Sequence, residues 1–481
     1  MQLSPVLNIL GLLTTVLAAA MLIPMCVDLY SGSGEWQVFA LSALLTAFFG
    51  VSVWLATNRR EEPGLGLRQA FLLTNGAWLL IGIFGALPFI FSELDLSLTD
   101  SVFESVSGIT TTGSTILPLI EIASPGILMW RALLQWLGGV GIVVMAMAVL
   151  PMLSVGGMQL FRTESYERAE NVVPRATQLA GGIGLIYTGL TAIWAIMLGF
   201  AGMNTFDAVT HAMTTLATGG YSTRTASIGA FDSVIIEWIV ILGMIVGSLP
   251  FAHYLAVTRG GWRSLINDPQ VRLFLLIVVT LIILLSWYLT HSGQAFGNAF
   301  RQSSFNAVSI MTGTGYVSAN YSAWGGFAST ILLMVMFIGG CGGSTTCGIK
   351  VFRLQVLAAT ARVQISRLLR PHAVVLAYYN RRPVTQEVMD SVMGFFYLYI
   401  LGFVLIATLL GLMGLDFVTA LSGAATSISN VGPGLGEVIG AAGNFSSLPD
   451  SAKWVMSFGM LLGRLEIFTV LVMLNPGFWQ R

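Results

Sequence analysis

Charged residues are scarce in this sequence. Asp, Glu, Lys and Arg together make up 9% of its 481 residues, whereas a soluble domain carries about 25%. The formal net charge is zero, so bulk electrostatics say nothing about nucleic-acid or acidic partners. We expect no nucleic-acid partner. A hydrophobic content of 55% accompanies the deficit of charge. The composition excludes an ordinary soluble protein and indicates a polytopic membrane protein in contact with the lipid bilayer.

Cysteine and histidine are also rare. The three cysteines are Cys26, Cys341 and Cys347, and an odd number argues against a disulfide framework. Cys341 and Cys347 are near enough in sequence to pair or to bind a metal, but packing inside the protein is the simpler interpretation. The four histidines show no metal-ligand or haem-ligand spacing, and no catalytic triad or carboxylate pair can be assembled. We therefore expect neither an enzyme nor an organic cofactor.

Long apolar segments recur along the whole chain. A helix needs about 20 apolar residues to cross a bilayer core of about 30 Å. Segments near that length lie at about 5–30, 36–56, 69–92, 125–153, 178–201, 232–257, 270–291, 325–349, 386–413 and 452–476. The first lacks the basic residues that open a signal peptide, so we expect it to remain as a membrane span. The sequence predicts about ten spans.

When ten spans are drawn, most Lys and Arg residues fall on one side of the membrane. One side receives three at 59–68, three at 162–175, three at 259–272, seven at 350–382 and the last residue. The exceptions are Arg131, Arg224, Arg301, Lys453 and Arg464. Because cytoplasmic loops carry an excess of Lys and Arg, this pattern predicts that both termini lie in the cytoplasm.

Four connections on the opposite side share one pattern. Each begins at a Phe, continues as a short amphipathic stretch, and ends in a β-branched residue followed by Gly. The first residues are Phe103, Phe206, Phe305 and Phe417, and the closing pairs are Thr112-Gly113, Thr218-Gly219, Thr314-Gly315 and Val431-Gly432. The glycines are 106, 96 and 117 residues apart, which indicates internal duplication. Each unit is a span, a short half-helix, a Gly-bearing loop and a second span.

The duplication predicts an all-α fold in which one unit is repeated four times. We expect a two-helix extension at 1–60 and four pore repeats at 61–160, 161–262, 263–375 and 376–481. Non-helical backbone at membrane depth is tolerated only where it is buried in protein or lines an aqueous path. Four such loops around one axis would present backbone carbonyls, which can replace the hydration shell of a monovalent cation. Each half-helix would also direct the negative end of its dipole at the cation.

The chain resembles the Trk/Ktr/HKT superfamily of potassium transporters, and within it the bacterial TrkH-type ion-translocating subunit. The resemblance covers nearly the full length and includes the stretches 130–139, 156–160 and 463–469. It implies that the four repeats of one chain form one pseudo-fourfold pore, and that potassium is taken up through this channel-like pore in the bacterial inner membrane. It also implies a homodimer that binds a TrkA-type cytosolic nucleotide-binding regulatory subunit.

The resemblance implies a potassium filter with one glycine per repeat. The residues that would hold K⁺ ions are Thr111, Thr112, Gly113, Thr218, Gly219, Thr314, Gly315, Asn430, Val431 and Gly432. In related plant proteins a Ser at the first of these glycine positions accompanies sodium selectivity. Gly113 therefore favours potassium.

A Gly-rich stretch interrupts the eighth apolar segment. Residues 339–348 include five glycines, and each Gly costs about 1 kcal/mol relative to Ala inside a helix. The stretch nearly fits a phosphate-binding loop, but Ile349 displaces the Lys and no predicted strand precedes it. The family implies instead an intramembrane gating loop below the filter. The implied gate residues are Gly339, Gly340, Gly342, Gly343, Ser344 and Arg464.

Arg464 stands alone in an apolar span, where charged residues usually face a cavity or a partner. The family implies contact between this Arg and the loop. The alternative is a structural pair with Glu466, but residues two apart on a helix do not face each other.

Other polar residues leave alternatives open. Glu104 and Asp207 occupy equivalent places in two half-helices, where they either enrich cations at the outer mouth or hydrogen-bond to loop backbone. Arg224 and Arg301 are candidate partners for such carboxylates. The basic stretch 350–382 either contacts anionic lipid or docks the regulatory partner.

The chain departs from the family in one loop, and one alternative transport mechanism is open. The family often has Pro-Gly in the loop at 162–175, where this chain reads Arg-Thr-Glu-Ser-Tyr-Glu-Arg, and this departure concerns partner docking. Within transport, a proton- or sodium-coupled potassium symporter is the alternative to a channel-like pore. A symporter is expected to place ionisable residues along the midplane path, and few are present beyond Arg464 and the half-helix acids.

Overall fold

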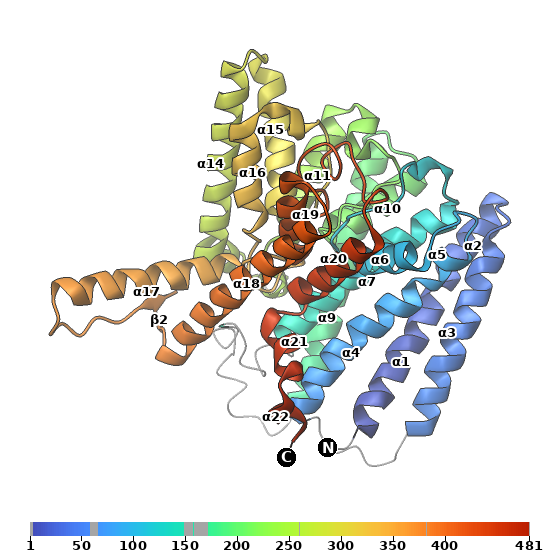
Figure 1. Ribbon diagram of the computed structural model, residues 1–481, viewed down its shortest axis with the longest axis horizontal. Coiled ribbons are helices and arrows are strands. Elements are labelled where there is room, and N and C mark those ends of the chain that lie inside the picture. Colours follow the sequence, from blue (N-terminus) through green and yellow to red (C-terminus); the bar gives the residue numbers. More distant parts are fainter. Residues whose placement is uncertain are drawn as a thin grey trace.

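The computed structural model describes residues 3–57, 66–148, 157, 172–258, 260–380 and 382–480. The helices and strands of these residues are all helices except two: β1 (Tyr378–Tyr379) and β2 (Arg382–Pro383) pair as a short antiparallel ribbon. Seven described helical segments are long and apolar enough to cross a bilayer. The protein is an all-α, multi-pass membrane protein (Figure 1).

Two extra helical segments precede the repeats. α1 (Ser4–Ala20) and α2 (Leu22–Ser31) together form one 28-residue span, and α3 (Trp36–Thr57) runs back beside α1 (Figure 1). Glycines allow the two backbones to approach closely: a Cβ built on Gly11 would lie 2.9 Å from the Gly50 oxygen, and the reverse distance is also 2.9 Å. Small residues at such crossings are typical of helix packing in membranes.

Each of the four repeats contains a long first helix, a short helix and a second apolar helix. The first helices are α4 (Leu67–Gly85), extended by α5 (Leu87–Phe91), then α9 (Val172–Phe200), α14 (Pro269–His291) and α18 (Gln386–Leu412). The short helices are α6 (Leu98–Ile109), α10 (Thr205–Leu216), α15 (Phe296–Met311) and α19 (Phe417–Ser429). The second helices are α7 (Pro125–Ala148), α11 (Val234–Gly247), α16 (Gly326–Met336) and α20 (Asp450–Arg464). The predicted fourfold repetition is confirmed.

Polar caps fix the start of three short helices. Ser97 and Asn204 accept hydrogen bonds from the main-chain N–H groups of Asp100 and Asp207, and Asp416 accepts two at the start of α19. These bonds satisfy N–H groups that have no partner within the helix. Asp100 and Asp207 also place negative charge at the positive end of the helix dipole. The four short helices then end in buried residues at the centre of the protein.

Three of the second spans are not continuous: the break within 325–349 agrees with the interruption predicted there, whereas 232–257 and 452–476 were expected to be single segments. α11 meets α12 (Phe251–Val257) at 95°, with Pro250 at the break, where a helix loses an N–H donor. α20 meets α21 (Ile467–Leu474) at 111°, where Glu466 has a φ of +63°. α16 ends at Met336 and residues 337–350 form a loop. The interruption predicted for repeat 3 thus has counterparts in repeats 2 and 4.

The remaining elements lie at the periphery. α17 (Val351–Leu369) and the β1–β2 ribbon extend sideways from the body as an arm, residues 351–383 (Figure 1). Two short helices, α13 (Arg263–Asn267) and α22 (Pro476–Trp479), follow α12 and α21, and the 3-10 turns are η1 (Ile120–Ile122), η3 (Ser227–Phe231) and η4 (Tyr321–Trp324). The N- and C-terminal ends lie at the same end of the molecule (Figure 1).

Candidate functional site

The four short helices end in the same backbone turn. In each turn a main-chain N–H donates to a carbonyl five residues earlier, at 2.9 to 3.1 Å; the donors are Thr112, Gly219, Thr314 and Val431. The residue before each donor has a φ between 50° and 67°: Thr111, Thr218, Gly313 and Asn430. The residue after each donor is a glycine with a φ between 78° and 111°: Gly113, Gly220, Gly315 and Gly432. The four turns are therefore equivalent residue by residue.

This equivalence differs by one residue from the prediction for repeat 2. Gly220, rather than Gly219, takes the place of the other three positive-φ glycines. Gly219 takes the place of Thr112 in the hydrogen-bond pattern. The glycine doublet permits either alignment, and the rule of a β-branched residue followed by Gly selected the first of the two. Gly220 therefore joins the candidate site.

The four glycines pack in a closed cycle against carbonyl oxygens of the neighbouring repeats. A Cβ built on each would lie 2.2, 1.8, 2.1 and 2.9 Å from an oxygen of the next repeat; the contacts are Gly113 with Gly219, Gly220 with Thr314, Gly315 with Val431, and Gly432 with Thr112. Real Cβ atoms essentially never approach a heavy atom within 3.0 Å. Repeat 1 contacts repeat 2, and so on until repeat 4 contacts repeat 1. Both φ and space require glycine at these positions.

Side chains tie the turns of repeats 1 and 4 together. The Asn430 Nδ2 atom donates to the Thr112 hydroxyl at 2.8 Å and to the Met460 carbonyl at 2.9 Å. The Ser114 hydroxyl donates to the Gly432 carbonyl at 2.7 Å. All ten residues predicted for the filter lie in these four turns.

Gln135 on α7 supports the turn of repeat 2 and is a residue that the sequence analysis missed. Its Nε2 atom donates to the Gly219 carbonyl at 2.6 Å, and its Oε1 atom accepts from the Tyr221 N–H at 3.0 Å. Gln135 is fully buried. A polar amide within the apolar stretch 130–139 was the available signal, because such residues in a span usually have a buried partner.

The acids of the short helices hydrogen-bond within the protein. Glu104 is fully buried, pairs with Arg131 at 2.8 Å and accepts from the main chain of the following loop. Asp207 pairs with Arg224 at 2.9 Å. Arg301 lies 3.5 Å from Glu237 instead of near either acid. Of the two alternatives, the hydrogen-bonding role is the one seen, and neither acid is exposed at an outer mouth.

A cavity of about 70 Å³ adjoins the turns and is lined mostly by residues that follow them in the chain. Gly113, Gly220 and Gly315 form part of its wall, together with Arg131 and Arg224. The glycine ring is therefore reached from this side through a small hollow.

Residues 337–350 form a closed loop on the other side of the turns. Its two ends are joined, because the Gly339 N–H donates to the Ile349 carbonyl and the Ile349 N–H donates to the Phe337 carbonyl, both at 2.9 Å. At its tip the Thr345 hydroxyl lies 3.1 Å from the hydroxyl of Thr218 in the turn of repeat 2. The loop thus lies directly beneath the ring.

The break between α11 and α12 holds one flank of the loop. The Cys341 N–H donates to the Ser248 carbonyl at 3.0 Å, and the Thr345 N–H donates to the Gly247 carbonyl at 3.2 Å. The Gly342 N–H donates to the Gln270 side chain at 2.8 Å. The backbone groups that the broken helix leaves unpaired therefore bond to the loop.

Arg464 holds the other flank, at the break between α20 and α21. Its Nη1 atom donates to the Thr345 carbonyl at 3.0 Å and lies 2.6 Å from the Cys347 sulfur, and its Nη2 atom donates to Gly138 on α7 at 2.8 Å. The side chain is 1% exposed. Arg464 therefore contacts the loop as expected. The alternative pair does not form, since Glu466 binds Arg353 at 2.5 Å.

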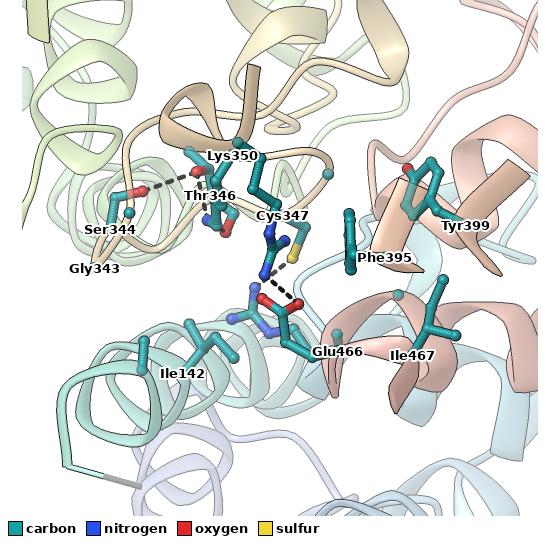
Figure 2. Close-up of a pocket in the computed structure, with 16 residues that line it drawn as sticks. Ile142, Gly343, Ser344, Thr346, Cys347, Lys350, Phe395, Tyr399, Glu466 and Ile467 are labelled. Atoms are coloured by element: carbon teal, nitrogen blue, oxygen red, sulfur yellow. Dashed lines mark hydrogen bonds and ion pairs between the residues drawn. The ribbon is translucent and has the colours of Figure 1, made fainter. Parts of the chain in front are cut away.

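A cavity of about 20 Å³ separates the loop from the α20–α21 break (Figure 2). A space of this size holds about one water molecule. Lys350, Arg353, Arg464 and Glu466 all line it, so its wall carries more positive than negative groups. Figure 2 shows Cys347 and Glu466 approaching this space from opposite sides.

The fold and the site define a membrane protein in which four re-entrant turns close a ring above an intramembrane loop. The family model described as "TrkH: Cation transport protein" matches residues 35–479, and the chain belongs to this family. It is 44% identical to the Trk system potassium uptake protein TrkI of Halomonas elongata, over 99% of this chain and 97% of the relative. It is 37% identical to the Trk system potassium uptake protein TrkH of Escherichia coli K12, over the full length of both.

A solved structure agrees with the fold. The crystal structure of the potassium transporter TrkH from Vibrio parahaemolyticus matches with a TM-score of 0.91 at 37% identity, and the match covers 100% of both chains. The departure noted at 162–168 lies outside the described residues, as do residues 156 and 158–160.

Proposed function

We propose that this chain is the ion-translocating subunit of a Trk-type potassium uptake system in the bacterial inner membrane. The closed cycle of Gly113, Gly220, Gly315 and Gly432 carries this proposal. Each glycine lets a neighbouring carbonyl oxygen come closer than any side chain would permit. Oxygen atoms gathered in this way replace the hydration shell of a potassium ion. The names of the relatives as potassium uptake proteins agree with this substrate.

The potassium filter is formed by the three residues of each turn. Four short helices end at the turns, and the negative ends of their dipoles favour a cation there. Equivalent positions of the four turns carry different side chains, so only the backbone of the ring is nearly symmetric. Thr112, Thr314 and Val431 occupy one layer with Gly219.

The loop at 337–350 is the gate. Gly339, Gly340, Gly342 and Gly343 give it a compact path, and Ser344 closes its tip by donating to the Cys341 carbonyl at 2.7 Å. Arg464 and Lys350 place positive charge in the ion path beneath the filter, where a low dielectric strengthens repulsion of a cation. Ion passage therefore requires the loop and Arg464 to separate.

The arm at residues 351–383 docks a TrkA-type cytosolic nucleotide-binding subunit, and the chain forms a homodimer. Leu368 and Leu369 on α17 are 84% and 78% exposed and lie beside basic residues, which suits a protein partner. The arm joins the gate directly, because the N–H of Val351, the first residue of α17, donates to the Gly340 carbonyl at 3.1 Å. A movement of α17 would pull on the loop.

Flux measurements in liposomes test the function. Purified protein is reconstituted and uptake of potassium, rubidium and sodium is followed with and without a membrane potential. We expect potassium and rubidium to move down their electrochemical gradients, faster than sodium and without any sodium or proton gradient. Flux that requires such a gradient would establish the symporter alternative and contradict a channel-like pore.

A further inference from the structure

A third and larger cavity lies among α1, α4 and α7. Its volume is about 390 Å³, within the range of about 300 to 1,000 Å³ typical of small-molecule pockets. Leu13 and Val16 line it from α1, Ala77 and Trp78 from α4, and Val140 and Val144 from α7. Among its described lining residues, only the Thr74 hydroxyl and the Trp78 indole are polar. Apolar cavities of this kind exclude water.

The open side of this cavity faces the hydrocarbon of the bilayer. All three helices belong to membrane spans. Val16 on its wall is 52% exposed, and Leu79 and Ile83, which follow on α4, are 54% and 48% exposed. Apolar side chains exposed at this depth contact lipid tails. The part of the bilayer that can enter the cavity is therefore the acyl chain of a lipid.

The wall of this cavity is also in contact with Arg464. The guanidinium carbon of Arg464 lies 5.4 Å from the centre of the Trp78 ring. Gly138 lines the cavity, and its carbonyl accepts the hydrogen bond from Arg464 Nη2. On the same helix, Ile142 and Ala146 line the small cavity beneath the loop. Helix α7 thus lies between the apolar cavity and the loop.

We propose that a phospholipid acyl chain from the bilayer occupies the α1–α4–α7 cavity and stabilises the contacts of Arg464 with the loop. The chain packs against Trp78 and holds that ring in place beside the guanidinium, a cation–π contact that is strengthened by exclusion of water. It also keeps α4 and α7 apart at Gly138. The coupling to the loop rests on the gate assigned above, whereas the binding of lipid does not.

Photolabelling tests the binding. The protein is placed in nanodiscs with a phospholipid that carries a diazirine in its acyl chain, irradiated, digested and mapped by mass spectrometry. We expect adducts on the cavity faces of α4 and α7. Two variants that fill or plug the cavity, Ala77→Phe and Val16→Trp, should lower this labelling several-fold, whereas Leu79→Phe on the outer face of α4 should not. Equal labelling of the α7 face in all variants would overturn the site.

Flux tests the coupling. Straight-chain lipids fit the cavity better than methyl-branched ones, so wild-type flux should be lower in straight-chain liposomes. The difference in flux between the two lipids should disappear in Ala77→Phe and persist in Leu79→Phe. If it persists in both variants, the lipid in the cavity does not influence the loop.

A variant that weakens the gate directly separates the two proposals. If Arg464→Gln raises flux while labelling is absent, the gate stands and the lipid site fails. If labelling is cavity-specific but Arg464→Gln leaves flux unchanged, the lipid site stands while the gate, and with it the coupling, fails.

Discussion

The Cα of Gly315 lies against the carbonyl of Val431, so closely that a Cβ on Gly315 would stand 2.1 Å from the oxygen. The same relationship holds between each repeat and the next, which makes the four turns mutually dependent. A disturbance at one glycine therefore moves an oxygen that belongs to another repeat. The four turns therefore form one ring rather than four independent loops.

Replacement of Gly315 by Ser should weaken the preference for potassium over sodium. The side chain displaces the Val431 oxygen, and a non-glycine residue in left-handed geometry costs about 1 to 2 kcal/mol. The ratio of potassium to sodium flux in liposomes measures the effect.

Gly297→Ser is the matched control for this prediction. Gly297 lies in α15, the helix that leads to the same turn, and a Cβ there would meet no heavy atom of the described chain within 4 Å. It should keep the wild-type flux ratio. If Gly315→Ser also keeps that ratio, the ring is not the selectivity filter.

Loss of the Gln135 amide should loosen the turn of repeat 2. Gln135→Leu leaves the buried Tyr221 N–H without its acceptor and the Gly219 carbonyl without its donor. An unpaired buried polar group costs about 1 to 3 kcal/mol, so both thermal stability and the potassium-to-sodium flux ratio should fall. Gln386→Leu, at an exposed position on α18, should change neither. Wild-type stability and selectivity in Gln135→Leu would show that the contact is dispensable.

The fourfold architecture could be predicted because its signals are local. Span length, the recurrent Phe-to-Gly stretches and the glycines at 339–348 each depend on residues close together in the sequence. The shift from Gly219 to Gly220 could not be resolved in this way, because either glycine of the doublet satisfies the pattern. The φ values and the hydrogen bond of the folded turn fix the alignment, and the contact of Gly220 with Thr314 in the next repeat agrees with it.

The two unexpected helix breaks depend on distant partners. Pro250 was visible as a helix-breaking signal, but the apolar residues around it favoured a single span. Glu466 departs from helical geometry and binds Arg353, a residue 113 positions earlier. Likewise, Glu104 pairs with Arg131 because the tertiary fold brings α6 and α7 together. Local pattern predicts the elements, whereas tertiary contacts decide where they bend and which charges meet.

Neutralising Arg464 should open the path. Arg464→Gln removes the charge and at least one of the bonds to Thr345 and Gly138 that anchor the loop. We expect higher potassium flux in the absence of any regulatory subunit, measured in liposomes. Arg263→Gln, which changes an exposed cation on α13, should leave the flux unchanged.

Shortening the loop tests the same gate independently of charge. A shorter, less Gly-rich segment in place of residues 339–348 should raise flux and weaken regulation. The gate assignment is wrong if the loop variant keeps the wild-type flux.

Removal of the Glu466 carboxylate should destabilise the protein. Arg353 is 1% exposed and lies over the Phe395 ring at 3.8 Å, so Glu466→Ala removes the Glu466 carboxylate from a buried guanidinium. Breaking one partner of a buried ion pair costs about 3 to 5 kcal/mol. The double variant Arg353→Leu/Glu466→Leu should recover part of this loss, as measured by thermal unfolding in detergent. Asp390→Ala, at an exposed site, should be nearly neutral, and additive losses in the double variant would contradict coupling of the pair.

The cap of α19 should stabilise the folded protein at neutral pH, and this stabilisation should be lost in acid. Hydrogen bonds from Thr419, and then from the Val418 N–H, hold the pKa of Asp416 below its usual value of 3.8. A carboxyl group whose pKa is lower in the folded state stabilises the fold above the unfolded pKa and loses this effect as the pH falls through the folded pKa. Asp416→Ala should therefore cost about 1 kcal/mol near neutral pH, and the gap from wild type should narrow as the pH falls below about 4.

Asp416→Asn separates the hydrogen bonds from the charge. Its side-chain oxygen still accepts from the start of α19 but does not titrate, so it should retain most of the stability with no acid-dependent loss. Thermal unfolding of wild type and the two variants across this pH range measures the difference. Because α19 leads directly into Asn430 in the turn of repeat 4, weakening its N-terminal cap also weakens one quarter of the ring. A gap between Asp416→Ala and wild type that stays constant with pH would show that the charge of Asp416 contributes nothing to the cap.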